Sequence, residues 1–121
     1  MKEMQSFLMM FYILDQCFDD CQESDLGSIL GSMSPEFMED GLPMDTAIFN
    51  DWLERTDVTL LNKENIIQAV YRFLNYYESE FEYCFEKTKK MLQAPPASVA
   101  DMVEKAVMQT DKMYQQHAYN N

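Results

Sequence analysis

Basic residues are scarce in this sequence of 121 residues: 9 Lys and Arg stand against 21 Asp and Glu, a net charge of 9 − 21 = −12. The imbalance lies in residues 1–60, with 13 acids and two bases (2 − 13 = −11), whereas residues 61–121 hold eight acids and seven bases (7 − 8 = −1). Such a field repels the phosphates of nucleic acids and anionic membranes, and it attracts basic proteins or cations. We therefore expect no nucleic acid and no membrane partner. A basic protein partner and an acidic surface that serves only solubility are the two alternatives.

Histidine is almost absent, and so are the motifs of the common chemistries. The single histidine, His117, lies near the C-terminus, and the three cysteines show no zinc-ligand spacing. The sequence has no phosphate-binding glycine loop, no paired CxxC motif and no H-E-x-x-H motif. Nucleophilic catalysis needs a base beside the nucleophile, and none is evident. We therefore expect no catalytic residues, no cofactor and no metal site.

Long hydrophobic runs are also missing. The apolar run at residues 7–14 has eight residues, whereas a membrane-spanning helix needs roughly 20. A signal peptide is not indicated, because one lysine precedes the run and three aspartates follow where a small-residue cleavage site should lie. Cys17 and Cys21 are four residues apart on one predicted helix, a spacing that closes no useful disulfide loop, and Cys84 is distant. We expect a cytoplasmic protein with reduced, mostly buried thiols.

Helical periodicity is what the sequence has in quantity, and no strand pattern is convincing. Apolar residues recur at steps of three and four in five stretches, at about residues 2–22, 26–33, 46–55, 63–93 and 98–114. The stripe over 63–93 keeps one phase, so we expect one long helix there rather than two helices separated near Ser79. The prediction is an all-α fold, an irregular bundle of about five helices in a single domain of residues 1–121, with a frayed tail at 115–121.

The N-terminal half of the first predicted helix is apolar on all sides, because Met9, Tyr12 and Ile13 lie off the main stripe. Burial on two sides explains this pattern. A homodimer formed through the same half of the helix is the alternative.

Residues 26–57 hold all three glycines, two of the four prolines and the only tryptophan. Trp52 lies on an apolar stripe, so we expect it in the core. Gly27 and Gly31 each cost a helix about 1 kcal/mol against alanine, and they either allow two backbones to approach closely or provide flexibility. An EF-hand is excluded, because aligning Gly41 with the obligatory glycine of that loop puts Ala47 where a glutamate is required.

The acids of residues 15–57 have almost no basic residue to neutralise them. Together with the loop after the second predicted helix, they could form one negative surface for a basic partner, with Phe37 as an apolar anchor. The predicted partner-binding residues are Asp15, Asp19, Asp20, Glu23, Glu36, Phe37, Glu39, Asp40, Asp51, Glu54 and Asp57.

Carboxylates at helical spacing suggest an enzymatic alternative. Glu78, Glu82 and Glu86 would share one face of the long helix, and Asp101 and Glu104 lie on the last helix. Acid clusters on facing helices hold magnesium in all-α pyrophosphohydrolases, so magnesium-dependent hydrolysis of a nucleotide has a mechanism. A solvated, salt-bridged face is the stronger interpretation, because lysines follow Glu86 at i+3 and i+4.

Residues 26–52 also carry a family resemblance. The run Leu26-Gly27-x-Ile29-Leu30-Gly31-x-Met33, followed by Asp40-Gly41-x-Pro43-x-Asp45 and Asp51-Trp52, resembles small acidic bacterial proteins associated with polymorphic toxins. These include immunity proteins of contact-dependent inhibition systems. The resemblance implies a non-catalytic inhibitor that sits on a cognate toxin, often a basic nuclease. An acidic nucleic-acid mimic that acts on another basic protein is a further alternative.

Overall fold

The computed structural model describes residues 1–34 and 46–117, and over these residues the regular structure is helical. The elements are α1 (Glu3–Cys21), α2 (Ser24–Met33), α3 (Thr46–Arg55), the 3-10 helix η2 (Val58–Leu60), α4 (Ile66–Phe81), α5 (Glu86–Leu92) and α6 (Pro96–His117). The all-α prediction is thereby confirmed for the described part of the chain. None of these helices combines the length and apolar character needed to cross a membrane. Residues 115–117, predicted to fray, continue α6.

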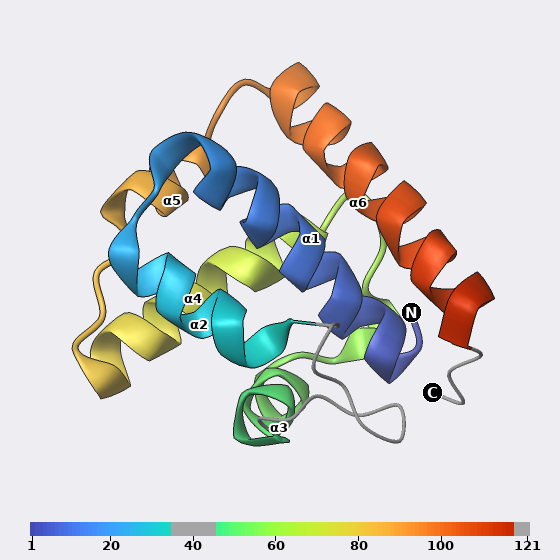
Figure 1. The fold of residues 1–121 in the computed structure, drawn as a ribbon, viewed down its shortest axis with the longest axis horizontal. Helices are drawn as coiled ribbons and strands as arrows, with labels where there is room; N and C mark the ends of the chain where they lie inside the picture. The colour runs from blue at the N-terminus through green and yellow to red at the C-terminus, as the bar shows by residue number, and fades with distance from the viewer. Residues whose placement is uncertain (35–45, 118–121) are drawn as a thin grey trace.

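Helix α1 is the element around which the others are arranged. It runs antiparallel to α6, and α2, α3 and α5 contact it elsewhere along its length (Figure 1). Met9 and Ile13, which lie off its main apolar stripe, are buried like the stripe itself. Burial within the chain therefore accounts for Met9 and Ile13, whereas Tyr12, the third residue off the stripe, is half-buried. The homodimer stays a prediction.

Trp52 fixes α3 against α1 and α4. Its side chain is fully buried, its indole Nε1 donates to Oγ of Ser6 on α1 at 2.9 Å, and its ring meets Phe73 of α4 edge-on at 5.8 Å between centroids. The Ser6 hydroxyl in turn donates to the carbonyl oxygen of Glu3 at 2.7 Å. The buried indole N–H thus has the partner that it needs, and the prediction of a core tryptophan is confirmed.

The two glycines of α2 have different surroundings. A Cβ added to Gly27 would lie 2.9 Å from Cε1 of Phe18 on α1, whereas a Cβ on Gly31 would meet no described atom within 4 Å. The close approach proposed for both glycines is therefore present only at Gly27. It joins a backbone and an aromatic ring rather than two backbones.

The single long helix predicted over 63–93 is wrong. Residues 63–65 form a turn, and residues 82–85 separate α4 from α5. Glu82 ends α4 in the left-handed conformation, with φ of 59°. Phe85 is fully buried, but Phe81 is 51% exposed and Cys84 is exposed, so the continuous stripe in the sequence does not form one buried face.

Candidate functional site

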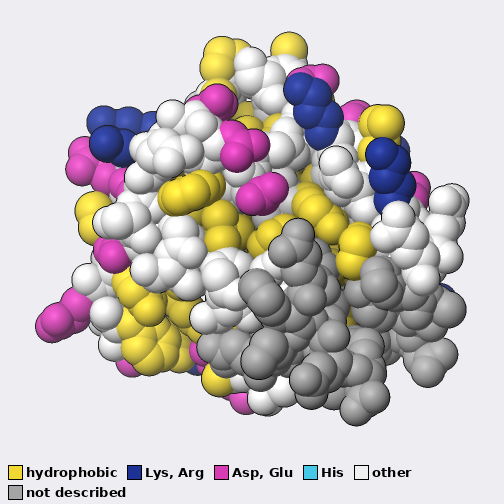
Figure 2. Space-filling model, in the orientation of Figure 1, with side chains coloured by type: hydrophobic (Ala, Val, Ile, Leu, Met, Phe, Trp, Pro, Cys, Tyr) yellow, Lys and Arg dark blue, Asp and Glu magenta, His cyan; other side chains and the backbone are white. Residues whose placement is uncertain are grey.

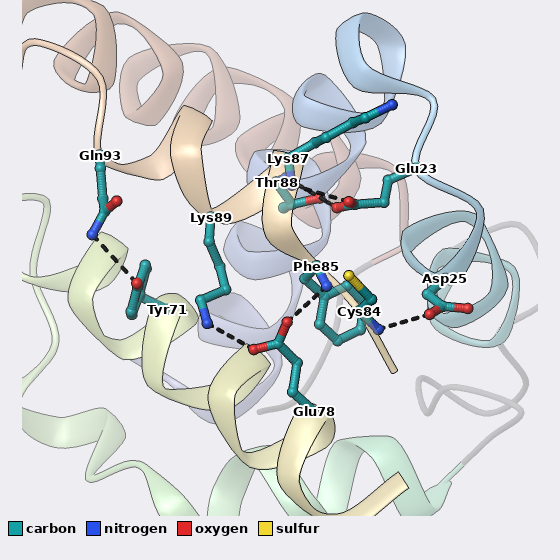
Figure 3. A network of polar contacts seen from close by, with 10 residues as sticks. All are labelled: Glu23, Asp25, Tyr71, Glu78, Cys84, Phe85, Lys87, Thr88, Lys89 and Gln93. Carbon is teal, nitrogen blue, oxygen red and sulfur yellow. Dashed lines mark hydrogen bonds and ion pairs between the residues drawn. The ribbon is translucent and has the colours of Figure 1, made fainter. Parts of the chain in front are cut away.

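The start of α5 is held by carboxylates from distant parts of the chain (Figure 3). Glu23, between α1 and α2, accepts hydrogen bonds from the backbone N–H groups of Lys87 and Thr88, both at 3.0 Å, and from the Thr88 hydroxyl at 2.7 Å. Asp25, in the first turn of α2, accepts from the backbone N–H of Cys84 at 2.7 Å. The first N–H groups of a helix lack partners inside the helix, and here the single side chain of Glu23, 64 and 65 positions away in sequence, supplies acceptors for two of them.

Glu78 of α4 is the third carboxylate of this group. It accepts from the backbone N–H of Phe85 at 2.8 Å and from Nζ of Lys89 at 2.7 Å. Burial by itself raises the pKa of both Glu23 and Glu78, but the hydrogen bonds that each carboxylate accepts outweigh burial and hold the pKa below its ordinary value of 4.5. Both groups are therefore ionised at neutral pH and serve as structural acceptors.

Three of the predicted partner-binding acids are thus engaged within the chain. Besides Glu23, Asp51 accepts from the hydroxyl of Tyr77 at 2.9 Å. Asp57 accepts from the backbone N–H of Thr59 at 3.1 Å and from its hydroxyl at 2.6 Å, and so caps η2. These contacts account for the three acids without a partner protein.

The acids at the end of α1 have fewer contacts with the rest of the chain. Asp19 and Asp20 are exposed, and their carboxylates form no hydrogen bond or ion pair with the residues that the structure describes. Asp15 is half-buried, and its pKa is raised first by burial and then by the negative charge of Asp19. On α3, the exposed Glu54 lies 3.5 Å from Nη1 of Arg55.

The described acids fall into two groups rather than one continuous surface. Asp15, Asp19 and Asp20 lie toward the C-terminal end of α1, whereas Asp51, Glu54 and Asp57 lie on α3 or just after it, on the opposite side in Figure 1. On the face seen in Figure 2, some acidic side chains lie beside Lys or Arg side chains, and others lie among hydrophobic and uncharged ones. The loop residues predicted to join the groups, Glu36, Phe37, Glu39 and Asp40, lie outside the described residues.

A small cavity, which we call the α1–α6 notch, borders the acidic end of α1. It has a volume of about 230 Å³, and its lining includes Asp20, Met91, Asp101 and Met102. Asp101 lies 3.0 Å from Nζ of Lys105, so its carboxylate is already paired. The periodicity of the sequence predicted both helices, but it carries no signal that Asp20 and Asp101, 81 positions apart (101 − 20), line one cavity.

The carboxylates of the enzymatic alternative do not share one face. Because α4 ends at Phe81, Glu78 and Glu86 belong to different helices. Four of the five acids form separate ion pairs instead, namely Glu78–Lys89, Glu86–Lys90, Asp101–Lys105 and Glu104–Lys63. Within residues 1–34 and 46–117, no group of three acids, cysteines or histidines is arranged to hold a metal ion. The pairing agrees with the salt-bridged interpretation.

The three cysteines are free thiols in different environments. Cys17 is buried, Cys21 is half-buried and Cys84 is exposed, so only the first fully meets the expectation of buried thiols. Burial, with smaller effects of Cys21 and the charge of Asp20, raises the pKa of Cys17 to about 12. Since the thiolate is the reactive form, Cys17 is a poor nucleophile at neutral pH.

Comparison of the chain with models of protein families, with curated proteins and with solved structures gave no match.

Proposed function

We propose that this protein is a non-catalytic binding protein of the bacterial cytoplasm, an immunity protein that neutralises a basic toxin domain, of nuclease type, through the acidic end of α1. The observation that carries the proposal is the pair of exposed carboxylates, Asp19 and Asp20, which have no partner among the described residues. They belong to residues 1–60, where the net charge is 2 − 13 = −11. The resemblance of residues 26–52 to immunity proteins implies the kind of partner, a toxin domain.

The packing of α1 holds these two carboxylates in a fixed position before a partner binds. The buried side of α1 includes Leu14 and Cys17, both fully buried, so the helix backbone at Asp19 and Asp20 is held in place. Little conformational entropy is then lost when the carboxylates pair with arginine or lysine of a partner. The α1–α6 notch adds Met91 and Met102, against which the aliphatic part of a basic side chain can lie.

A charge-reversal pair tests this surface. In Asp19→Lys/Asp20→Lys the net charge rises by four units, and we expect the association rate with the partner at low salt to fall at least about tenfold, because steering depends on opposite charge. The control Glu64→Lys/Asp111→Lys makes the same change in net charge at exposed positions away from the end of α1. An equal loss of rate in both variants would attribute binding to net charge alone and overturn the proposed surface.

The partner itself is tested by co-purification with the product of the adjacent upstream gene. The proposal expects a complex that dissociates as the salt concentration rises. If that gene encodes no toxin-like domain and its product does not bind, the immunity role is refuted.

A further inference from the structure

An aromatic side chain is exposed where α4 ends. Phe81, the last residue of α4, is 51% exposed. Figure 2 shows hydrophobic side chains gathered at the lower left, where α4 ends in Figure 1. The half-buried Tyr83 lies beside Phe81, with 6.4 Å between the ring centroids. Aromatic side chains are enriched at protein–protein interfaces, so this surface is a candidate for one.

Buried rings hold the two exposed ones in position. Tyr77, which is buried, meets Phe81 edge-on at 4.9 Å between centroids and stacks on Tyr83 at 6.0 Å. Phe85, which is fully buried, packs against Tyr83 at 5.7 Å. No described aromatic ring lies parallel to Phe81, so ring surface is open to a planar group. Because these rings are already ordered, a partner that stacks on them loses little entropy in fixing them.

Two uncompensated carboxylates flank the exposed ring. Glu80 and Glu82 are exposed and form no hydrogen bond or ion pair with the residues that the structure describes. Glu80 borders a cavity together with Arg55 and Arg72 but pairs with neither. We call Phe81, Tyr83, Glu80 and Glu82 the α4-end patch. Its aromatic faces and its carboxylates both attract a cation.

The chain already binds one guanidinium group by this combination. The central carbon of the Arg55 guanidinium lies 3.3 Å from the centre of the Tyr76 ring, and its Nη1 lies 3.5 Å from Glu54 and 3.7 Å from Asp51. Within residues 1–34 and 46–117, no lysine or arginine lies over Phe81 or Tyr83. The patch therefore offers a second place of the same kind, without a cation from the described part of the chain.

These features select among possible partners. A second copy of this chain would bring the four carboxylates of two patches together, and each copy carries a net charge of −12, so repulsion opposes self-association here. Anionic membranes and nucleic acids are repelled by the same charge. A basic protein segment is attracted instead. Arginine suits the patch better than lysine, because its planar guanidinium can stack on a ring and pair with a carboxylate at the same time.

We propose that the α4-end patch binds an arginine-bearing segment of a protein partner. The guanidinium group stacks on Phe81 and pairs with the flanking carboxylates, and Tyr83 provides the adjoining apolar contact. This patch lies at the end of α4, whereas Asp19 and Asp20 lie near the end of α1. The two surfaces are tested by different variants, so the failure of one proposal does not decide the other.

The test is an NMR titration of the isotope-labelled protein with a pentapeptide that contains two arginines and is blocked at both ends. The same peptide is made with lysine, and with neutral citrulline, in place of both arginines. We expect saturable shifts of the backbone signals of residues 80–83 with the arginine peptide, weaker binding of the lysine peptide and none of the citrulline peptide. Equal binding of the three peptides, or no saturable shift at residues 80–83, would overturn the proposal.

Substitutions at Phe81 test the ring without changing the charge. Phe81→Ala should weaken binding of the arginine peptide about two- to fivefold, as expected for one exposed cation–π contact. Phe81→Leu should lose as much, because it keeps an apolar side chain but lacks the aromatic face. Met108→Ala is the matched control, since Met108 is 63% exposed on α6, and its affinity should be unchanged. Full affinity in Phe81→Leu, or equal loss in Phe81→Ala and Met108→Ala, would contradict stacking on the ring.

The carboxylates are tested by Glu80→Gln/Glu82→Gln, which should weaken binding roughly two- to tenfold at low salt, as expected for two exposed ion pairs. Glu64→Gln/Asp111→Asn makes the same change in net charge at other exposed positions and should lose less. Equal loss in the two variants would attribute binding to net charge alone. Signals of residues 80–83 that shift when the free protein is diluted would assign the patch to a second copy of the chain. Either result would overturn the proposal.

Discussion

Gly27 and Gly31 share a helix, yet only one of them has a structural reason to lack a side chain. In a helix interior glycine is about 1 kcal/mol less favourable than alanine, because it loses more backbone entropy on folding. At Gly27 a side chain would collide with the Phe18 ring, which explains why glycine is present despite this cost. At Gly31 no described atom is near enough to exclude a side chain. The sequence shows two equivalent glycines, so their difference could not be predicted from spacing.

Alanine substitutions at the two glycines should therefore change stability in opposite directions. Gly31→Ala should raise the free energy of unfolding by up to about 1 kcal/mol, through helix propensity. Gly27→Ala should lower it, because overpacking costs roughly 1–3 kcal/mol and exceeds the propensity gain. Urea denaturation of both variants measures this, and Phe18→Leu added to Gly27→Ala should recover part of the loss. Equal shifts of one sign would show that Phe18 moves aside freely.

Helix α5 depends on elements that are far from it in sequence. It has seven residues, too few to be stable alone, and its own N-cap residue supplies no side-chain hydrogen bond. Glu23, Asp25 and Glu78 provide acceptors in its place. Release of these carboxylates should therefore loosen α5 before the rest of the fold.

Acid should release them. The pKa values of Glu23 and Glu78 are lowered in the folded state, so their contribution to stability is present above the ordinary pKa of 4.5 and is lost as pH falls through the lower, folded pKa. We expect the free energy of unfolding to decrease below about pH 5. The decrease should be smaller in Glu23→Gln/Glu78→Gln, which should already be destabilised by about 1–3 kcal/mol at pH 7.

Denaturation curves at pH 7 and pH 4 measure this difference, and hydrogen exchange of α5 amides locates it. Glu86→Gln is the control, because that exposed carboxylate pairs, within the described part of the chain, with Lys90 alone. Comparing variants also removes the opposite contribution of Asp15, whose raised pKa favours the folded state as pH falls. A pH dependence identical to that of the unmodified protein would refute the role of Glu23 and Glu78.

The break between α4 and α5 shows which part of the fold the sequence could predict. The bounds of α3 agree with the prediction, and those of α1 differ from it by a residue at each end, because apolar periodicity is a local signal. Residues 82–85 contain no glycine or proline, and the apolar stripe continues through them. The acceptors for this segment are Asp25, for the N–H of Cys84, and Glu78, for the N–H of Phe85. Glu23, which the sequence predicts as a partner-binding residue, accepts instead from the first turn of α5.

At the scale of the whole molecule, the net charge of −12 opposes folding through self-repulsion. The six ion pairs seen among the described residues lie mostly at the surface, where each contributes little. Composition predicts the size of the charge. It does not predict that Glu23, Asp51 and Asp57 are engaged inside the chain while Asp19 and Asp20 stay available, because that depends on tertiary contacts.

Salt should therefore stabilise the free protein. Raising NaCl from about 10 mM to about 0.5 M shortens the screening length to a few ångströms, and we expect the melting temperature to rise by a few degrees. Glu64→Lys/Asp111→Lys, with a net charge four units less negative, should respond less. The same salt should weaken binding to a basic partner. Calorimetry should therefore show a higher melting temperature of the free protein and a lower affinity for the partner as the salt concentration rises. A melting temperature that falls with salt would show that surface ion pairs outweigh repulsion.

Because α1 packs against α6, its burial during synthesis must wait until α6 has been made. α6 begins 75 residues after α1 ends (96 − 21), so at typical rates of roughly 5–20 residues per second it follows several seconds later. Until then one apolar side of α1 lacks its native cover. During those seconds the nascent α1 is the segment that a chaperone would hold and the place where aggregation would begin.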